Sequence, residues 1–262
     1  MKLSEFCLTD LHIPPEWDKE FNHVATDSRD VEAGDLFIAR AGLSSHGDEF
    51  IDAAVKAGAV VVLSEGKSGF RCIWHTDEAS GAVASIPVFS TPDLGEQLSI
   101  WLHRRYASVK TLDLIGITGT NGKSSCAQYV AQLSSSLGEP CGVLGTLGNG
   151  VWPDLKPTRN TTADLATVLK SLEIMQQAGA KRAVMEVSSH GLEQGRVAGL
   201  SFRAVMMTNL TQDHLDYHGD METYFAAKRR LFAEYDSPLA LLNADDAWCR
   251  RLLDDAGLTA QH

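Results

Sequence analysis

The chain has 262 residues, of which 44% are hydrophobic and 22% charged, a composition typical of a globular protein rather than a disordered or fibrous one. Its net charge of -11 argues against a broad surface for nucleic acid or anionic membranes. Five scattered cysteines argue against a disulfide framework, and the charged N-terminus lacks the apolar core of a signal peptide. The longest apolar run is too short to span a bilayer, so we expect a cytoplasmic protein without membrane insertion.

The N-terminal part of the chain predicts a small α/β domain. Gly34–Arg40 is a strand candidate, Phe50–Ala57 has helical spacing, and Ala59–Leu63 is a candidate for a buried strand. Thr91-Pro92-Asp93 is typical of a helix start, because proline is favoured in the first turn, and this helix would run to about Tyr106. We therefore place a domain boundary near Thr91, with an N-terminal domain over residues 1–91 and a central domain over residues 92–262.

The second part of the chain shows a regular alternation of strand and helix patterns. In the first of its helices, Cys126, Val130, Leu133 and Leu137 recur at helical spacing. The predicted strands are Leu112–Thr118, Ala183–Val187, Val205–Leu210 and Leu239–Asn243, and the predicted helices are Ser124–Leu137, Leu165–Met175, Met221–Tyr235 and Ala247–Ala256. This alternation predicts an α/β fold with a mostly parallel sheet covered by helices.

A glycine-rich segment, Gly116–Ser125 (GITGTNGKSS), follows the first of these strands and opens a helix. At such a junction backbone N–H groups can surround phosphates, and the helix N-terminus favours negative charge. Lys123 can reach the β- and γ-phosphates, and the Ser124 hydroxyl can bind Mg²⁺. The predicted ATP-binding residues are Gly119, Thr120, Asn121, Gly122, Lys123, Ser124 and Ser125.

The glycine spacing departs from the usual phosphate loop. The pattern G-x-x-x-x-G-K-S would need glycine at position 117, where this chain has Ile117, so the chain carries the shorter G-x-x-G-K-S. An ordinary strand–turn–helix junction is the alternative explanation. The order of strand, glycines, lysine, serine and helix favours phosphate binding.

Several further motifs, taken in order, resemble the Mur ligase family. The form T-G-T-N-G-K is used by Mur ligases and by folylpolyglutamate synthetase. The other matching segments are Thr26–Arg29, Gly34–Phe37, Asn160–Thr162, Met185–Leu192, Thr208–Leu210 and Asp213–Gly219. Together they are similar to the muramoyl-tripeptide synthetase branch, which adds a diamino acid to UDP-N-acetylmuramoyl-L-Ala-D-Glu.

The resemblance implies a substrate site made of two groups of residues. The uridine nucleotide group is Thr26, Ser28, Leu43, Ser44 and Ser45; the muramoyl-peptide group is Asn160, Thr161, Thr162, Ser188, Gln194 and Arg196. Hydroxyls and amides can bind sugar hydroxyls and amide groups, and Arg196 can pair with phosphate or carboxylate. Taken singly, loop Ser, Thr and Asn residues more often serve turns and caps, so the assignment depends on the ordered set.

The resemblance also implies a catalytic Mg²⁺ site, whose residues are Ser124, Glu186, His214 and a carbamylated Lys228, with Lys123 as a further catalytic residue. Glu186 ends a predicted strand at the edge where α/β proteins bind ligands. His214 and His218 could alone suggest a zinc pair, but loop character argues against a regular helix presenting both. Taken alone, Lys228 would be a solvated lysine; carbamylation would convert it into a carboxylate-like ligand.

The implied reaction is ATP-dependent amide formation in peptidoglycan precursor synthesis. The substrate carboxylate takes the γ-phosphoryl group of ATP, and an incoming amino group then displaces phosphate. Meso-diaminopimelate is the expected diamino acid, with L-lysine as the alternative. A folylpolyglutamate synthetase-like ligase and a non-catalytic nucleotide-binding module remain the alternative functions.

The strand–helix pattern ends near Ala256, before the remaining strands of a Mur central domain. The C-terminal domain that binds the amino acid in this family is also absent from the sequence. We therefore expect this chain to be an inactive fragment whose unpaired sheet edge favours association. For the full-length enzyme we expect a monomer that does not bind nucleic acid.

Overall fold

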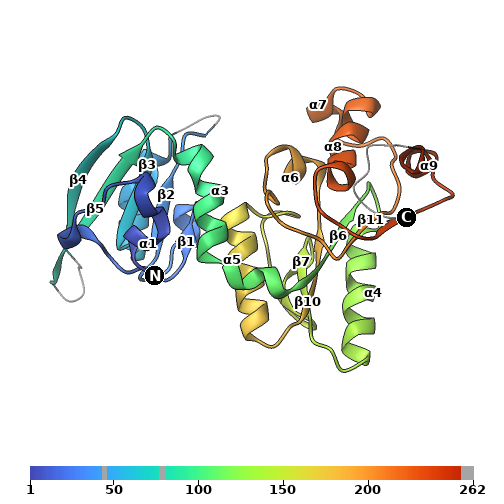
Figure 1. The fold of residues 1–262 in the computed structure, drawn as a ribbon, viewed down its shortest axis with the longest axis horizontal. Helices are drawn as coiled ribbons and strands as arrows, with labels where there is room; N and C mark the ends of the chain where they lie inside the picture. Colours follow the sequence, from blue (N-terminus) through green and yellow to red (C-terminus); the bar gives the residue numbers. More distant parts are fainter. Residues whose placement is uncertain (43–45, 77–80, 255–262) are drawn as a thin grey trace. The chain divides into compact units, whose positions relative to one another are not determined.

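The computed structural model describes residues 1–42, 46–76 and 81–254, which fall into two compact units (Figure 1). The first unit is Met1–Ala107 and the second begins at Ser108. Within the described ranges, no helix is both long and apolar enough to cross a membrane.

The first unit is built on a five-stranded sheet with the order β1-β2-β3-β5-β4. Its strands are parallel except for β4, which pairs antiparallel with β5. The strands are β1 (Val24–Ala25), β2 (Leu36–Ala39), β3 (Val61–Glu65), β4 (Gly69–Thr76) and β5 (Val83–Thr91). The α-helices are α1 (Leu3–Cys7), α2 (Ile51–Ala57) and α3 (Leu94–Arg105), and short 3-10 helices span residues 8–10, 15–17, 28–30, 47–50 and 107–111.

The predicted strands at Gly34–Arg40 and Ala59–Leu63 and the helix at Phe50–Ala57 are confirmed as β2, β3 and α2. Both strands lie inside the sheet and are buried almost throughout, which is why their apolar runs stand out in the sequence. The helix predicted from Thr91-Pro92-Asp93 to about Tyr106 is confirmed as α3, which begins after its N-cap residue Asp93. Thr91 itself is the last residue of β5, and the hairpin of β4 and β5 was not predicted.

Helix α3 packs on the core of the first unit, which ends at Ala107. Its Trp101 is 1% exposed, donates a hydrogen bond from Nε1 to Asp10 Oδ2 at 2.9 Å, and lies 5.7 Å from the Phe6 ring. Just after the helix, the Tyr106 hydroxyl accepts a hydrogen bond from Val24 N at 3.3 Å. A limit placed before α3 would expose this apolar face, so the compact unit extends past the predicted domain end at residue 91. The position of the domain boundary stays a prediction.

The second unit is built on a seven-stranded sheet with the order β12-β11-β6-β10-β7-β8-β9. The strands β12 to β7 are parallel, whereas β8 and β9 extend the sheet as antiparallel strands. The strands are β6 (Asp113–Thr118), β7 (Cys141–Gly145), β8 (Gly148–Val151), β9 (Asp154–Lys156), β10 (Arg182–Glu186), β11 (Ala204–Met207) and β12 (Ala240–Leu242). The helices are α4 (Lys123–Ser136), α5 (Leu165–Gln177), α6 (Ser189–Glu193), α7 (Leu215–His218), α8 (Met221–Ala233) and α9 (Ala247–Leu253).

The predicted mostly parallel sheet with covering helices is thus confirmed in the second unit. The predicted strands correspond to β6, β10, β11 and β12, and the predicted helices to α4, α5, α8 and α9. The register pairs Glu186 of β10 with Ile117 of β6, and Met207 of β11 with Thr118. The segments that follow these three strands therefore leave the sheet at one edge, where α/β proteins bind ligands.

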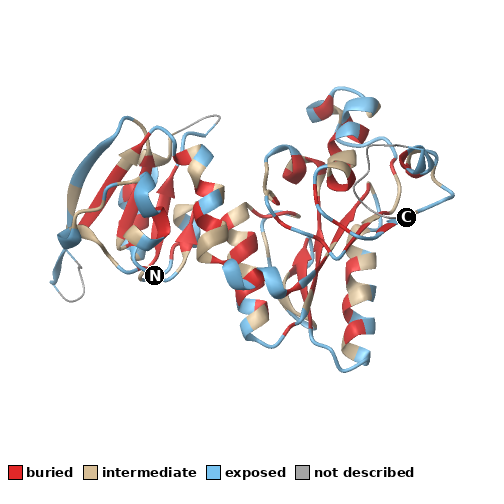
Figure 2. Ribbon diagram, in the orientation of Figure 1, coloured by how far each residue is buried: buried red, intermediate tan, exposed pale blue. Residues whose placement is uncertain are grey.

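The apolar face of α4 differs from the expected one (Figure 2). Ala127 and Ala131 are buried, and α4 packs on β7 and β10. The small alanine side chains allow the helix to approach the sheet closely. Leu133 and Leu137, expected to face the core, are 67% and 79% exposed, so these two side chains lie on the outer face of the helix.

Candidate functional site

The glycine-rich loop lies between β6 and α4, at the sheet edge just described. Gly119 and Gly122 have φ values of +136° and +84°, in the region that side chains rarely adopt. A Cβ atom at Gly119 would lie 2.0 Å from Thr208 Oγ1. Glycine at position 119 is therefore required by the close approach of the segment that follows β11.

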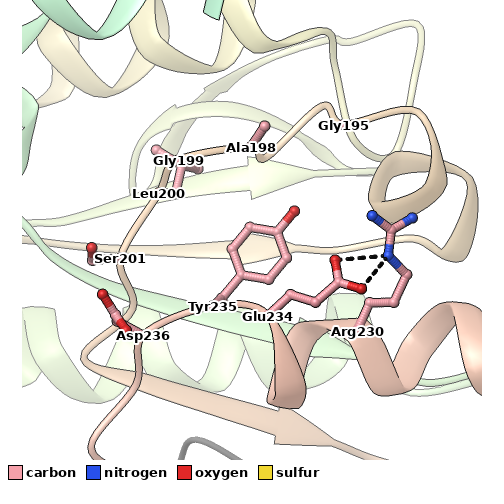
Figure 3. A pocket seen from close by; sticks show the side chains of 9 residues that line it. All are labelled: Gly195, Ala198, Gly199, Leu200, Ser201, Arg230, Glu234, Tyr235 and Asp236. Carbon is pink, nitrogen blue, oxygen red and sulfur yellow. Dashed lines mark hydrogen bonds and ion pairs between the residues drawn. The ribbon is translucent and has the colours of Figure 1, made fainter. Parts of the chain in front are cut away.

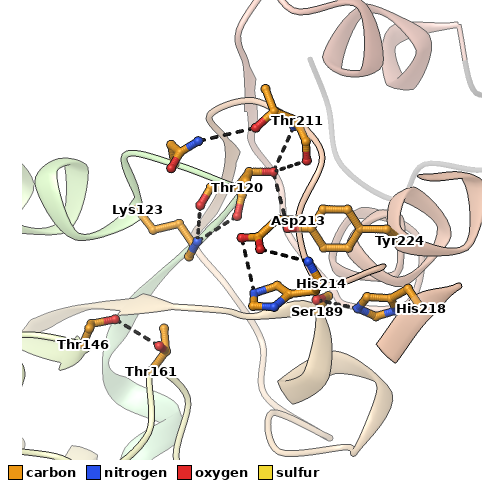
Figure 4. A network of polar contacts seen from close by, with 12 residues as sticks. Thr120, Lys123, Thr146, Thr161, Ser189, Thr211, Asp213, His214, His218 and Tyr224 are labelled. Atoms are coloured by element: carbon orange, nitrogen blue, oxygen red, sulfur yellow. Dashed lines mark hydrogen bonds and ion pairs between the residues drawn. The ribbon is translucent and has the colours of Figure 1, made fainter. Parts of the chain in front are cut away.

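The loop is fixed by hydrogen bonds to residues 208–211 (Figure 4). Thr120 N and Asn121 N donate to Asn209 O and Asn209 Oδ1 at 2.9 and 3.0 Å. Thr208 Oγ1 and Asn209 Nδ2 donate to Asn121 O at 2.7 and 3.1 Å. The Thr120 hydroxyl accepts from Thr211 N at 3.0 Å. These hydrogen bonds join the loop to the segment that follows β11. The loop conformation is therefore stabilised by the sheet as well as by its own glycines.

Two lysine ammonium groups converge on one carbonyl oxygen of this loop. Lys123 Nζ donates to Gly119 O and Thr120 O at 2.8 Å each, and Lys228 Nζ donates to Gly119 O at 3.0 Å. Burial lowers the pKa of Lys123, while the charges of Glu186 and Asp213 act in the opposite direction. The arrangement concentrates positive charge at the start of α4, which suits a polyphosphate.

Lys228 is buried, whereas a lysine considered without its family context would be expected to face solvent. It lies on α8, is 1% exposed, and its Nζ atom lies 4.6 Å from the centre of the Tyr224 ring. Burial, followed by repulsion from Lys123, lowers the pKa of Lys228 to about 7. At neutral pH a large share of this amine is therefore unprotonated and nucleophilic.

Glu186 is a buried carboxylate at the end of β10, as the sequence predicted. It is 2% exposed and accepts hydrogen bonds from Thr146 N at 2.8 Å and from Thr146 Oγ1 at 3.3 Å. A Cβ atom at Gly145 would lie 2.2 Å from Glu186 Oε1, so glycine there leaves room for the carboxylate. Thr146 also contacts Thr161 through their hydroxyls at 3.0 Å.

Most of the predicted muramoyl-peptide residues form internal hydrogen bonds around Glu186. Thr162 Oγ1 donates to Glu186 O at 2.9 Å and accepts from Ser188 N at 3.0 Å. Arg196 Nη1 donates to Thr162 O at 2.6 Å, while Arg196 Nε and Nη2 bind Gln194 Oε1 at 3.0 and 2.6 Å. Thr162, Ser188, Gln194 and Arg196 are thus brought together. Their role toward a ligand stays a prediction.

Ser188 and Asn160 complete that group. The Ser188 hydroxyl caps α6 by accepting from Gly191 N at 3.0 Å. Asn160 accepts a hydrogen bond on its backbone oxygen from Thr158 Oγ1 at 3.3 Å. Both contacts are of the turn and cap type expected for such residues in any loop.

A histidine cluster lies beside the phosphate loop. His214 has a φ of +52° and occupies the N-cap position of the short helix α7 without a side-chain capping bond. Its Nε2 atom lies 3.5 Å from Asp213 Oδ2. His218 is buried, and its Nε2 atom lies 2.9 Å from the Ser189 hydroxyl. The segment expected to be a loop therefore contains one short helix, α7, which begins after His214. Burial, with the neighbouring histidines, lowers the pKa of His190.

The predicted uridine group lies in the first unit. Ser28 belongs to the 3-10 helix 28–30, which Asp27 caps by accepting from Arg29 N at 2.9 Å. Thr26 immediately precedes this cap and is partly exposed. Leu43, Ser44 and Ser45 lie outside the described residues.

The residues expected to bind Mg²⁺ provide only part of a metal-binding site while Lys228 is unmodified. Among the described residues, no group of three or more His, Cys, Asp or Glu side chains has a metal-binding arrangement. Glu186 supplies one carboxylate, His214 one imidazole and Ser124 one hydroxyl, while an ammonium at Lys228 cannot be a ligand. Carbamylation would add a second carboxylate-like group, and Mg²⁺ prefers oxygen ligands.

A separate pocket of about 360 Å³ lies elsewhere in the second unit (Figure 3). It is lined by none of the residues predicted for the site. Its cation, Arg230, donates from Nε to both carboxylate oxygens of Glu234 at 2.9 Å. The pocket therefore offers no excess positive charge for a nucleotide.

Several site residues had no role in the sequence analysis: Thr146, Thr208, Asn209, Thr211, Asp213 and Tyr224. Thr208 and Asn209 were part of a matching motif, but nothing in the sequence indicated that they hold the phosphate loop. The signal that could have found them is polar residues directly after a buried strand, β11, that neighbours the strand of the phosphate loop.

Comparisons with known proteins bear directly on this site. Residues 117–260 match the model of the Mur ligase middle domain, and residues 20–100 match that of the Mur ligase family catalytic domain. The UDP-N-acetylmuramoyl-L-alanyl-D-glutamate--2,6-diaminopimelate ligase of Haemophilus influenzae is 42% identical over 242 residues, which are 90% of this chain and 49% of the relative. The Pseudomonas aeruginosa protein of the same name is 43% identical over 248 residues, 94% of this chain and 49% of the relative.

Solved structures give the same result for the fold. A ligase structure of that name is 34% identical with a TM-score of 0.70, and the match covers 98% of this chain and 50% of that one. The UDP-N-acetylmuramoylalanyl-D-glutamyl-2,6-diaminopimelate--D-alanyl-D-alanyl ligase from Acinetobacter baumannii is 18% identical with a TM-score of 0.65. The match covers 95% of this chain and 48% of that one, and at this identity it supports only a shared fold. The chain spans about half the length of the curated relatives it matches. Because the middle-domain model matches more than half of the chain, at residues 117–260, the protein belongs to the Mur ligase family.

Proposed function

We propose that this chain carries the nucleotide- and UDP-substrate-binding parts of an ATP-dependent ligase of peptidoglycan precursor synthesis. The ligase adds diaminopimelate to UDP-N-acetylmuramoyl-L-Ala-D-Glu. Relatives named for this reaction, at 42% and 43% identity, support it over a folate ligase. The first unit binds the uridine end of the substrate, and the second binds ATP.

The observation that carries the proposal is the phosphate loop with its two lysines. Lys123 and Lys228 both donate to Gly119 O, and the loop is pinned to residues 208–211. A phosphate entering this loop replaces the carbonyl as the partner of Lys123, and gains backbone N–H groups at the start of α4. The residues that bind ATP are Gly119, Thr120, Asn121, Gly122, Lys123, Ser124 and Ser125.

The protein contributes to the reaction by placing charge and holding reactants. A carboxylate oxygen of the muramoyl dipeptide attacks the γ-phosphorus, and the bond to the departing ADP oxygen breaks. Lys123 offsets the charge that develops on the phosphoryl oxygens. The amine of diaminopimelate then attacks the acyl carbon, phosphate leaves, and the amine proton passes to solvent or a nearby base. The substrate residues are Thr26, Ser28, Leu43, Ser44, Ser45, Asn160, Thr161, Thr162, Ser188, Gln194 and Arg196.

Mg²⁺ would be held by Ser124, Glu186, His214 and carbamylated Lys228. When bound, it would neutralise phosphate charge. The Glu186 carboxylate is already oriented by Thr146, so its oxygens are fixed before any metal arrives.

Lys228 is suited to carbamylation by its position and its pKa of about 7. The unprotonated amine attacks the carbon of CO₂, a C–N bond forms, and one proton is released. The product carries negative charge where the ammonium carried positive charge. This change removes the repulsion between Lys228 and Lys123 and creates a metal ligand instead.

A ligation assay on the full-length protein tests the proposal. ATP and Mg²⁺ are supplied with either UDP-muramoyl dipeptide or a folate, and with diaminopimelate, L-lysine or L-glutamate. We expect tripeptide product with diaminopimelate. Product with folate and glutamate alone would favour the folate ligase, and nucleotide binding without any product would favour a non-catalytic module.

A further inference from the structure

Tyr224 lies between the phosphate loop and the histidine cluster (Figure 4) and also contacts Lys228. It is on α8, one turn before Lys228, and is 1% exposed. Residues four apart share a helix face, so both side chains point toward the loop. The proposed function assigns Tyr224 no role.

Its hydroxyl contacts the phosphate loop directly. Tyr224 Oη lies 3.3 Å from Thr120 Oγ1, which itself accepts a hydrogen bond from Thr211 N at 3.0 Å. A tyrosine hydroxyl is protonated at neutral pH, so it can donate this hydrogen bond to Thr120 Oγ1. Thr120 is thereby held from two sides, by Thr211 and by α8.

The Tyr224 ring contacts Lys228 and two histidines of the cluster. Lys228 Nζ lies 4.6 Å from the ring centre, within the range of a cation–π contact. The ring centres of His218 and His214 lie 5.1 and 6.1 Å away. The ring therefore confines the Lys228 side chain to the direction of Gly119 O, its hydrogen-bond acceptor.

We infer that Tyr224 is a positioning residue for nucleotide binding, which fixes Thr120 through its hydroxyl and directs Lys228 through its ring. The inference rests on the proposed binding of ATP at this loop. If Tyr224 only filled the core, its ring would matter and its hydroxyl would not. Substitution by phenylalanine removes the hydroxyl alone, and substitution by leucine removes the hydroxyl and the aromatic ring, so the two variants separate these contributions.

The test is calorimetric titration of Mg-ATP into the chain and its variants. Tyr224→Phe is expected to bind about fivefold more weakly, as for one lost hydrogen bond. Tyr224→Leu, which also removes the ring, is expected to bind more weakly still. Tyr235→Phe, which changes a buried tyrosine of the separate pocket, is the matched control and is expected to bind like the unaltered chain.

A double-mutant cycle shows whether the hydroxyl acts through Thr120. Thr120→Val, which removes the hydroxyl, is expected to bind Mg-ATP weakly. Adding Tyr224→Phe to Thr120→Val should weaken binding no further, because the shared hydrogen bond is already lost. Thermal unfolding by circular dichroism should show every variant folded.

The outcomes distinguish a failure of the positioning role of Tyr224 from a failure of the proposed ATP binding. If the unaltered chain binds ATP and Tyr224→Phe binds it equally well, Tyr224 has no positioning role. Additive losses in the cycle would show that its hydroxyl does not act through Thr120, and would also overturn the inference. If the unaltered chain binds no ATP, the proposed function fails and the role of Tyr224 fails with it.

Discussion

Lys228 is the residue whose chemistry departs most from its sequence context. The segment YFAAKRR predicts an ordinary exposed lysine on a helix. The fold instead buries Lys228 against Tyr224 and beside Lys123. The resemblance alone indicated a special role, because no spacing rule describes a lysine with a pKa of about 7. The low pKa arises from burial and from a cation more than a hundred positions away in the chain.

The lowered pKa of Lys228 predicts how stability depends on pH. Between about pH 7 and the ordinary lysine pKa of 10.5, the folded chain holds Lys228 largely neutral, while the unfolded chain keeps it protonated. The unfolded state then binds more protons, so the contribution of Lys228 to stability rises with pH across this window. Below pH 7 its buried charge destabilises the fold. Relative to Lys228→Met, the unaltered chain should therefore gain stability from pH 6 to pH 10.

Denaturant unfolding of both proteins at several pH values, without bicarbonate, provides the measurement. Lys170→Met, which alters a lysine of α5 outside the site, controls for general charge effects. A difference between the unaltered chain and Lys228→Met that stays constant from pH 6 to pH 10 would contradict the pKa of about 7.

Carbamylation of the same residue predicts a spectroscopic signal. With ¹³C-labelled bicarbonate near pH 8, the unaltered chain should show a carbamate resonance that is missing from Lys228→Ala. The signal should be lost on acidification, because a carbamate decomposes when protonated. A spectrum of Lys228→Ala identical to that of the unaltered chain would assign the carbamate to another amine.

At the scale of elements, the phosphate loop depends on the close contact between Gly119 and the end of β11. Gly119→Ala would place a Cβ atom 2.0 Å from Thr208 Oγ1 at a φ of +136°. We expect this change to displace the loop and to weaken ATP binding at least tenfold. Gly138→Ala is the matched control, because its φ is +79° and no heavy atom lies within 4 Å. It should reduce stability by about 1 kcal/mol and leave ATP binding unchanged. Equal ATP affinities in the two variants would show that the loop tolerates a side chain at position 119.

Several of the elements that the sequence predicted have an apolar pattern that matches their burial. β2 and β3 are buried apolar strands, and α5 buries Val168, Leu169 and Leu172 at helical spacing. The hairpin strand β4 is mostly exposed, so its sequence has no clear alternation. The contacts that shape the phosphate loop could not be predicted either. They join residues 87 to 91 positions apart through hydroxyls and amides that would suit any loop.

At the scale of the whole molecule, the chain consists of two units with separate proposed ligands. Ser28→Ala, in the first unit, should weaken binding of UDP-muramoyl dipeptide and leave Mg-ATP affinity unchanged, because Ser28 lies outside the ATP-binding unit. Ser68→Ala changes an exposed serine of the same unit and should alter neither affinity. Titrations with both ligands provide the measurement. Unchanged dipeptide binding in Ser28→Ala would remove Ser28 from the substrate site.

The most direct test of the account is the affinity of this chain for Mg-ATP with and without the Lys123 side-chain cation. Calorimetry compares the unaltered chain with Lys123→Ala and with Lys110→Ala, which changes an exposed lysine of the same unit. We predict measurable binding by the unaltered chain and by Lys110→Ala. In Lys123→Ala we predict a loss of affinity of at least about a hundredfold, because a charge-assisted contact to phosphate disappears. Equal affinities in Lys123→Ala and the unaltered chain would contradict the account.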